Sequence, residues 1–150
     1  MNYYFLKEDL NHLDSKINEI KKKIQAARND KALSTTQSSE TWHDNYGFEE
    51  GVRQINFYAN ELMKYLEIKQ KAIIAPIPQN NKIGIGSFVR IKDETEKETD
   101  IKIGSFLAFE NDSISYNSPL GSLLMGGKVG EIKNGLIGNK NKKIEILEIK

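Results

Sequence analysis

Apolar side chains recur with a heptad spacing in the first half of the chain. The first series is alternately four and three residues apart, at Leu6, Leu10, Leu13, Ile17, Ile20, Ile24 and Ala27. A second series with the same rhythm lies at Phe48, Val52, Ile55, Ala59, Leu62 and Leu66. This spacing keeps apolar side chains on one stripe of an α-helix that packs against another helix. The pattern therefore predicts two long helices.

Each apolar stripe needs the other in order to be buried, so we expect one antiparallel helical hairpin. Pairing about a midpoint near residue 38 predicts three facing pairs: Leu13 with Leu62, Ile20 with Ile55, and Ala27 with Phe48. A dimeric coiled coil is the competing structure, but the Ser-, Thr- and Asn-rich residues 34–47 favour a turn over a continuous helix. We expect a monomer whose hairpin tip falls at about residues 36–44.

The second half of the chain has a different composition. It contains all three prolines and most of the 11 glycines, whereas the first 75 residues contain no proline. The change falls at Pro76-Ile77-Pro78-Gln79-Asn80-Asn81, a composition typical of a linker. We therefore predict a helical hairpin at residues 1–75, a linker at 76–82 and a second module at 83–150.

Short β-rich runs dominate this second module. Strands are predicted at residues 83–92, 101–110, 113–116, 129–133 and 143–149, with an acidic loop at 93–100. Ser118 and Pro119 provide the cap and first turn of a short apolar helix, which Gly126 and Gly127 end. The expected fold class is α+β, with a long helical hairpin followed by a twisted antiparallel sheet that carries one helix.

Composition narrows the classes of function. The chain contains no cysteine, which excludes disulfides and thiolate metal sites and suits the cytoplasm. No apolar run resembles a signal peptide or a membrane span, so no membrane partner is expected. The net charge is +1, from 22 basic and 21 acidic residues. Nucleic-acid binding by phosphate neutralisation alone is therefore not expected, and another partner would have to bring the protein to nucleic acid.

Two segments resemble one known family. The run from Ile114 to Glu131 reads ISYNSPLGSLLMGGKVGE, which is a strand, a Ser-Pro pair, an apolar helix and a Gly-Lys turn. The segment Gly47-Phe48-Glu49-Glu50-Gly51, followed by Arg53, lies in the second predicted helix. Both segments, and the order of the two modules, resemble the Gre family of bacterial transcript cleavage factors. The resemblance extends over essentially the whole chain.

The resemblance implies a fold, a partner and a role. The second module would have an FKBP-like fold and anchor on bacterial RNA polymerase, with Asn117, Ser118, Pro119 and Leu120 as the expected docking residues. The hairpin would enter the secondary channel, through which backtracked RNA is extruded, and reach the RNA 3′ end. The protein would not be an enzyme alone, because it would stimulate the polymerase's own Mg²⁺-dependent cleavage. It would hold no cofactor of its own and share Mg²⁺ with the polymerase.

The resemblance also implies roles for residues at the tip and on the first helix. Glu40 and Asp44 would assist the polymerase metal site, since carboxylates are preferred ligands of Mg²⁺. The remaining expected tip contacts are Thr41, Trp42, His43 and Asn45. A basic face that guides RNA is expected at Lys21, Lys22, Arg28 and Lys31.

The tip departs from the family's Asp-x-x-Glu-Asn pattern. Here the two acids, Glu40 and Asp44, are four positions apart and enclose Trp42 and His43. A gapless alignment from the Ala27 side instead places the acid-free residues 32–36 at the tip. Three other functions are alternatives: a non-catalytic regulator that occupies the channel, a coiled-coil adaptor and a prolyl isomerase. The isomerase would need an aromatic-lined pocket, for which the second module offers only four aromatic residues: Phe88, Phe106, Phe109 and Tyr116.

Overall fold

The chain forms two compact units. The computed structural model describes the backbone of residues 1–37 and 46–150 and the side chains of residues 1–30 and 47–150. One unit contains Met1–Leu10 together with Ala72–Lys150, and the other contains Asn11–Lys71. Sequence composition divided the chain at residues 1–75, 76–82 and 83–150. Residues 1–10 and 72–75 thus belong, by their contacts, to the unit that the second half of the chain forms.

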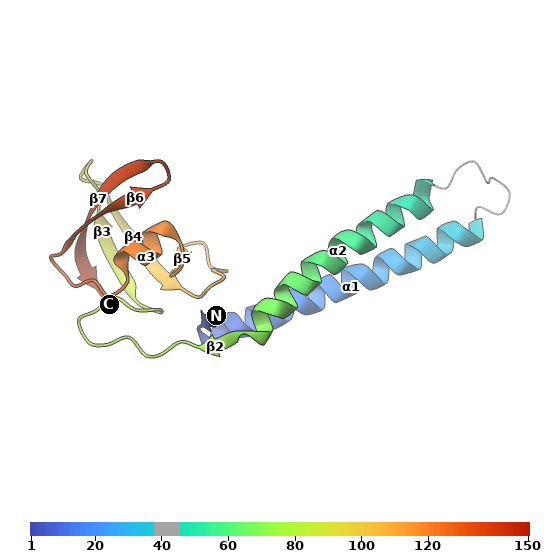
Figure 1. Cartoon of the computed structure of the whole chain (residues 1–150), viewed down its shortest axis with the longest axis horizontal. Helices are drawn as coiled ribbons and strands as arrows, with labels where there is room; N and C mark the ends of the chain where they lie inside the picture. Colours follow the sequence, from blue (N-terminus) through green and yellow to red (C-terminus); the bar gives the residue numbers. More distant parts are fainter. Residues whose placement is uncertain (38–45) are drawn as a thin grey trace. The chain divides into compact units, whose positions relative to one another are not determined.

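Two long helices form the helical unit. Helix α1 (Lys7–Gln37) and helix α2 (Tyr46–Gln70) run antiparallel and lie side by side (Figure 1). Five residues of the first apolar stripe are at most 8% exposed: Leu13, Ile17, Ile20, Ile24 and Ala27. On α2, four residues of the second stripe are half-buried: Val52, Ile55, Ala59 and Leu62. The predicted helical hairpin is confirmed.

The register of the hairpin differs from the prediction. An ion pair joins Lys69 Nζ to Asp14 Oδ1 at 2.5 Å, and Lys23 Nζ lies 5.7 Å from the centre of the Tyr58 ring. If Leu13 were level with Leu62, Asp14 and Lys69 would be about 12 Å apart along the helix axis. The two helices are therefore paired about one heptad further along α2 than predicted.

Shifting one helix by a heptad sets one apolar position against another, so the stripes alone do not distinguish the two registers. The polar contacts that flank the stripes do distinguish them. In the observed register Ile20 is level with Leu62, and Phe48, predicted to face Ala27, is 37% exposed. The predicted pairs Leu13–Leu62, Ile20–Ile55 and Ala27–Phe48 are wrong for this reason.

A small parallel sheet was not predicted. Strand β1 (Tyr3–Phe5) pairs with strand β2 (Ala72–Ile74), and the Ala75 amide donates to the Phe5 carbonyl at 2.8 Å. The sequence placed residues 72–74 in the second helix of the hairpin, but α2 ends at Gln70. The β-branched pair Ile73-Ile74 favours an extended backbone once a partner strand is available.

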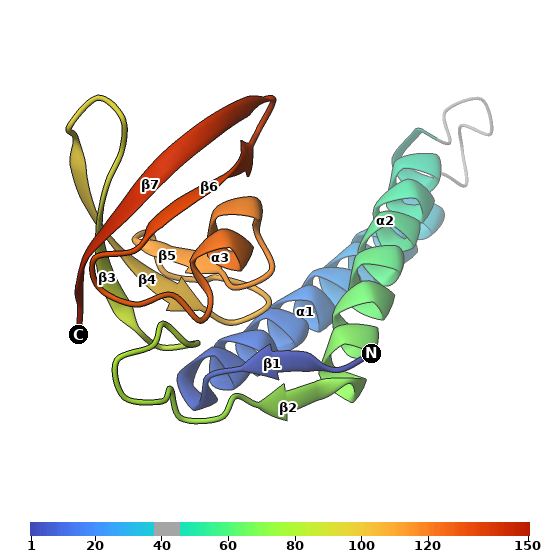
Figure 2. The same cartoon turned by 60° about the vertical axis from the view of Figure 1, so that its left-hand side comes forward.

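The main sheet has five strands in the order β5-β4-β3-β7-β6. Their bounds are β3 (Phe88–Lys92), β4 (Glu98–Gly104), β5 (Ser113–Ser115), β6 (Ile132–Ile137) and β7 (Lys140–Ile149). Four of the strands pair antiparallel, but β5 runs parallel to β4. The sheet is therefore mixed rather than antiparallel, as Figure 2 shows from the side of helix α3 (Pro119–Leu124).

One apolar core lies between α3 and the sheet. Eight residues form it: Ile83, Val89, Ile91, Ile101, Ile103, Leu124, Ile144 and Ile146. Ile83 and Ile85 are buried but precede β3. The strand that was predicted to begin at residue 83 therefore begins five residues later, at Phe88. Gly86 has φ +98°, a left-handed conformation that ends an extended run. The acidic residues Glu98–Asp100, predicted as loop, instead begin β4.

The first turn of α1 is anchored in this unit by a buried polar contact. The Ser105 hydroxyl donates to Asp9 Oδ2 at 2.5 Å and accepts from the Leu6 amide at 2.7 Å. Ser105 is 0% exposed and Asp9 is 3% exposed. Tyr3 also stacks on Phe106, with ring centroids 4.1 Å apart. The N-terminal residues are therefore an integral part of the sheet unit.

We expect the Ser105→Ala variant to lower the free energy of unfolding by about 1 to 3 kcal/mol, because it removes a donor to a buried carboxylate. A urea titration followed by circular dichroism measures the change. Ser122→Ala is the matched control, since Ser122 is exposed and its hydroxyl donates to the Tyr116 carbonyl at 3.3 Å. An unchanged Ser105→Ala variant would contradict the anchoring role.

Candidate functional site

The corner between β5 and α3 is built by its serine residues. The Ser118 hydroxyl accepts from the Gly121 amide at 3.0 Å and donates to the Ser115 carbonyl at 2.7 Å. Ser118 is the N-cap of α3, and Pro119 follows at the first helical position. A Cβ atom at Gly121 would lie 2.1 Å from the Ser115 carbonyl oxygen, so only glycine fits there. The predicted cap and Ser-Pro helix start are confirmed.

The four predicted docking residues differ in what they can contact. Asn117 and Pro119 are exposed, whereas Ser118 and Leu120 are half-buried. Leu120 packs against the apolar core, and Ser118 holds the corner together. Asn117 and Pro119 thus form the accessible part of the corner, and the other two residues set its shape.

The predicted basic face lies on α1. Lys21, Lys22 and Arg28 are exposed, and within the described part of the chain none has a carboxylate at ion-pair distance. Lys21 and Arg28 are seven residues apart and therefore share a face of the helix. The helix also contains Lys31, whose side chain lies outside the described residues.

The side chain of the adjacent Lys23 is paired with a carboxylate of the same helix. It forms an ion pair with Glu19 at 3.2 Å. The hydrogen bond between them lowers the pKa of Glu19 and raises the pKa of Lys23. Both groups stay charged at neutral pH, and their charges offset each other. Lys21, Lys22 and Arg28 therefore carry the positive charge that this part of α1 presents.

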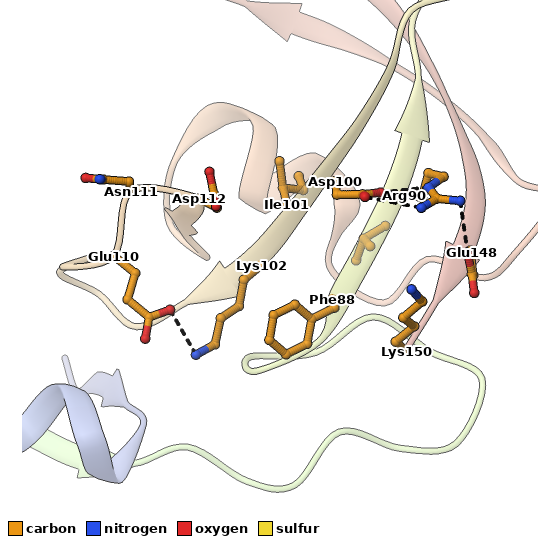
Figure 3. Close-up of a pocket in the computed structure, with 11 residues that line it drawn as sticks. Phe88, Arg90, Asp100, Ile101, Lys102, Glu110, Asn111, Asp112, Glu148 and Lys150 are labelled. Carbon is orange, nitrogen blue, oxygen red and sulfur yellow. Dashed lines mark hydrogen bonds and ion pairs between the residues drawn. The ribbon is translucent and has the colours of Figure 1, made fainter.

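A groove of about 310 Å³ lies on the sheet face opposite α3 (Figure 3). Sequence reasoning did not predict it. Its labelled lining residues come from β3, β4, the loop after β4, β7 and the residue that follows β7: Phe88, Arg90, Asp100, Ile101, Lys102, Glu110, Asn111, Asp112, Glu148 and Lys150. The signal for it was the alternation of charged and buried residues along β3 and β4, which predicts a charged outer face.

The charges in the groove are mostly paired with each other. Arg90 makes two hydrogen bonds to Asp100, at 2.7 and 3.2 Å, and lies 3.6 Å from Glu148. The bond to Asp100 raises the pKa of Arg90 and lowers the pKa of Asp100. Burial lowers the pKa of Lys102, but the hydrogen bonds and charges of Glu110 and Glu8 together outweigh it and raise that pKa. This pairing orders the groove and leaves it little net charge.

The residues predicted at the hairpin tip lie outside the described residues. These are Glu40, Thr41, Trp42, His43, Asp44 and Asn45. Helix α1 extends to Gln37, so residues 32–36 are helical and do not form a turn. An alignment that places these acid-free residues at the tip would put the tip inside helix α1 rather than in a turn. Glu40 and Asp44 fall in the segment that connects the two helices.

Within residues 1–30 and 47–150, no three His, Asp or Glu side chains are grouped closely enough to hold a metal ion. The helices that the structure describes include none that is long and apolar enough to cross a membrane.

A long helical hairpin followed by a mixed sheet with a Ser-Pro corner defines a two-part class of protein. A sequence model described as "Transcription elongation factor, GreA/GreB, C-term" matches residues 78–150, which include the sheet and the corner. The chain belongs to the GreA/GreB family of transcription elongation factors, as the identity and coverage of the relatives below show.

Several relatives match over both units. The chain is 34% identical over 134 residues to transcription elongation factor GreA of Thermosipho melanesiensis, a match that covers 87% of this chain and 80% of that protein. It is 32% identical over 151 residues to GreA of Clostridium botulinum, covering 96% and 88%. Among solved structures it is similar to GreA factor homolog 1 (Gfh1) of Thermus thermophilus, at 18% identity and a TM-score of 0.46, covering 100% and 99%.

Proposed function

We propose that this protein binds RNA polymerase in the bacterial cytoplasm and stimulates cleavage of backtracked RNA. The hairpin would enter the secondary channel, and its acidic tip would reach the RNA 3′ end near the active centre. The hydrolysis would be carried out by the polymerase, so the protein is not an enzyme by itself. Membership of a family of elongation factors supports this assignment.

The observation that carries the proposal is the geometry of the hairpin. Helix α2 has 25 residues, which corresponds to a rod about 37 Å long. Its partner helix buries five apolar residues along the same length. A rod stabilised by a buried stripe keeps its two ends at a fixed distance from each other, as a factor acting inside a narrow channel requires.

The acidic residues of the connecting segment fit the chemistry of phosphodiester hydrolysis. Two metal ions stabilise the attacking and leaving oxygens of such a displacement, and carboxylates are suited to Mg²⁺. Glu40 and Asp44 would help to place Mg²⁺ beside the polymerase's own catalytic metal. Lys21, Lys22, Arg28 and Lys31 would guide the RNA along the hairpin.

A non-catalytic regulator that occupies the channel is the second candidate. The observation that favours it is the tip sequence, because Glu40 and Asp44 are four residues apart rather than three and enclose Trp42. A bulky aromatic residue between the acids suits contact better than metal binding. The two candidates share the docking unit and differ only in what the tip does.

A cleavage assay on a purified backtracked elongation complex separates the candidates. With Mg²⁺ present, we expect the full-length protein to shorten the RNA from its 3′ end faster than the polymerase does alone. If the protein binds the complex but never accelerates cleavage at any Mg²⁺ concentration, the regulator is the better assignment.

The docking role of the corner gives a further prediction. We expect the double variant Asn117→Ala/Pro119→Ala to bind polymerase about tenfold more weakly, because exposed interface anchors contribute roughly 1 to 2 kcal/mol. Competition against labelled wild-type protein measures the change. Asn80→Ala/Pro76→Ala is the matched control, since it removes the same residue types from exposed positions in the linker. Equal affinities of the two double variants would exclude the corner as the anchor.

A further inference from the structure

The hairpin of β6 and β7 extends beyond the rest of the sheet. Strand β3 pairs with β7 only from Glu145 to Ile149, whereas β6 and β7 pair with each other from Ile132↔Glu145 to Ile137↔Lys140. Residues 134–143 therefore form a two-stranded ribbon, which we name the basic ribbon. Figures 1 and 2 show the turn between β6 and β7 at the far end of the sheet.

Charge is concentrated on this ribbon although the chain is nearly neutral. Its ten residues, NGLIGNKNKK, contain three lysines and no acid, while the whole chain has a net charge of +1. Lys140, Lys142 and Lys143 are exposed, and none has a carboxylate at ion-pair distance among the described residues. The three cations are thus available to an external anion.

The acidic loop after β3 lies at the base of the ribbon and fixes it. Glu94 Oε1 accepts a hydrogen bond from the Lys143 amide at 3.0 Å. On β6, Gly135 lies against Leu123 of α3, where a Cβ atom would come within 2.9 Å of the leucine side chain. Both contacts hold the base of the ribbon. Lys140 and Lys142 lie toward the turn, and Lys143 lies at the base beside the acidic loop.

We propose that the basic ribbon binds the phosphate backbone of duplex DNA. A two-stranded β-ribbon fits the major groove, which is about 12 Å wide. Lysines neutralise phosphates, and the exposed amides of Asn134, Asn139 and Asn141 are donors and acceptors for phosphates and base edges. Leu136 is 65% exposed and provides the apolar contact that a thymine methyl or a sugar accepts.

The composition of the ribbon favours a duplex over a single strand. Single-stranded nucleic acid is bound by stacking of its bases on aromatic side chains, and residues 134–143 contain no aromatic residue. The carboxylates near the base of the ribbon repel DNA, so the interaction is weak and strongly dependent on salt. This inference rests on the ribbon alone and does not depend on the proposed function of the hairpin tip.

Fluorescence anisotropy with a labelled blunt duplex tests the proposal on the full-length protein. Neutralisation of three phosphates gives a slope of about −2.7 for log K against log salt, a loss of roughly 40-fold between about 50 and 200 mM. We expect the triple variant Lys140→Gln/Lys142→Gln/Lys143→Gln to lose at least tenfold in affinity at low salt and to show a nearly flat salt dependence.

The matched control removes three exposed lysines elsewhere, as Lys7→Gln/Lys64→Gln/Lys82→Gln. It carries the same net charge as the ribbon variant and is expected to bind like the wild type, and unchanged melting curves establish that both variants fold. The proposal is overturned if the wild type fails to bind duplex at low salt or if the two triple variants weaken equally. It is also overturned if single-stranded RNA or polyglutamate competes as well as the duplex does.

Discussion

The Ile20→Asp variant is expected to lose the helical hairpin at room temperature. Ile20 is 0% exposed in the middle of the α1 stripe, so the substitution removes an apolar contact and buries an unpaired carboxylate. The expected destabilisation is more than about 4 kcal/mol, which is close to the whole stability of a small unit. Helices α1 and α2 contain 31 and 25 residues and α3 only 6, so the helical far-UV circular dichroism signal would fall by most of its amplitude.

The control is Asn18→Asp, which adds the same charge two positions away on the exposed face of α1. Its stability should stay within about 0.5 kcal/mol of the wild type. The sheet unit has its own core, so dispersed amide resonances of β3, β4 and β7 should persist in the Ile20→Asp variant. If Ile20→Asp melts at the wild-type temperature, the stripe is not what stabilises the hairpin.

The heptad pattern predicted the hairpin but not its register. Apolar residues that repeat every seven positions leave nearly the same surface facing the partner after a shift of one heptad. The contacts that fix the register, Lys69 with Asp14 and Lys23 with Tyr58, involve polar positions beside the stripe. Long flexible side chains can reach several partners, so their pairing is not readable from spacing alone.

Only part of the sheet could be predicted, because some of its strand pairings join segments that are far apart in the sequence. Strands with a buried alternating pattern, such as β7, are evident from local sequence, and so is the helix that Ser118 caps. Strands β1 and β2 have three residues each and lie about 70 positions apart, so nothing local indicates that they pair. The parallel pairing of β5 with β4 likewise depends on the path of the loop between them.

The candidate sites also divide into those that the local sequence indicates and those that depend on the strand order. The Ser-Pro corner is a local structure, and its hydrogen bonds are those that the residue types predict. The groove beside Phe88 and the basic ribbon combine residues from separate strands, so they required the strand order. Asp9 and Ser105 are 96 positions apart, and their buried contact could not be foreseen from either segment.

Glu40→Ala and Asp44→Ala are each expected to abolish stimulated RNA cleavage under the proposed function. The affinity for polymerase should stay nearly unchanged, because the docking corner lies in the other unit. The double variant should be little worse than either single variant, since residues that act as one unit have non-additive effects. Raising the Mg²⁺ concentration should restore part of the activity, because an incomplete set of ligands lowers metal occupancy before it removes the site.

Asp30→Ala and Glu49→Ala are the matched controls for these two variants, as they remove exposed carboxylates from α1 and α2. Both should retain cleavage, which would show that activity depends on the position of the carboxylates and not on the total charge of the hairpin. The measurement is the rate of RNA shortening in a backtracked complex, with binding followed in parallel. If the protein instead inhibits the polymerase, Trp42→Ala should relieve the inhibition more than either carboxylate variant, because an aromatic contact then carries the interaction. Retained cleavage in both Glu40→Ala and Asp44→Ala would exclude metal placement by the tip.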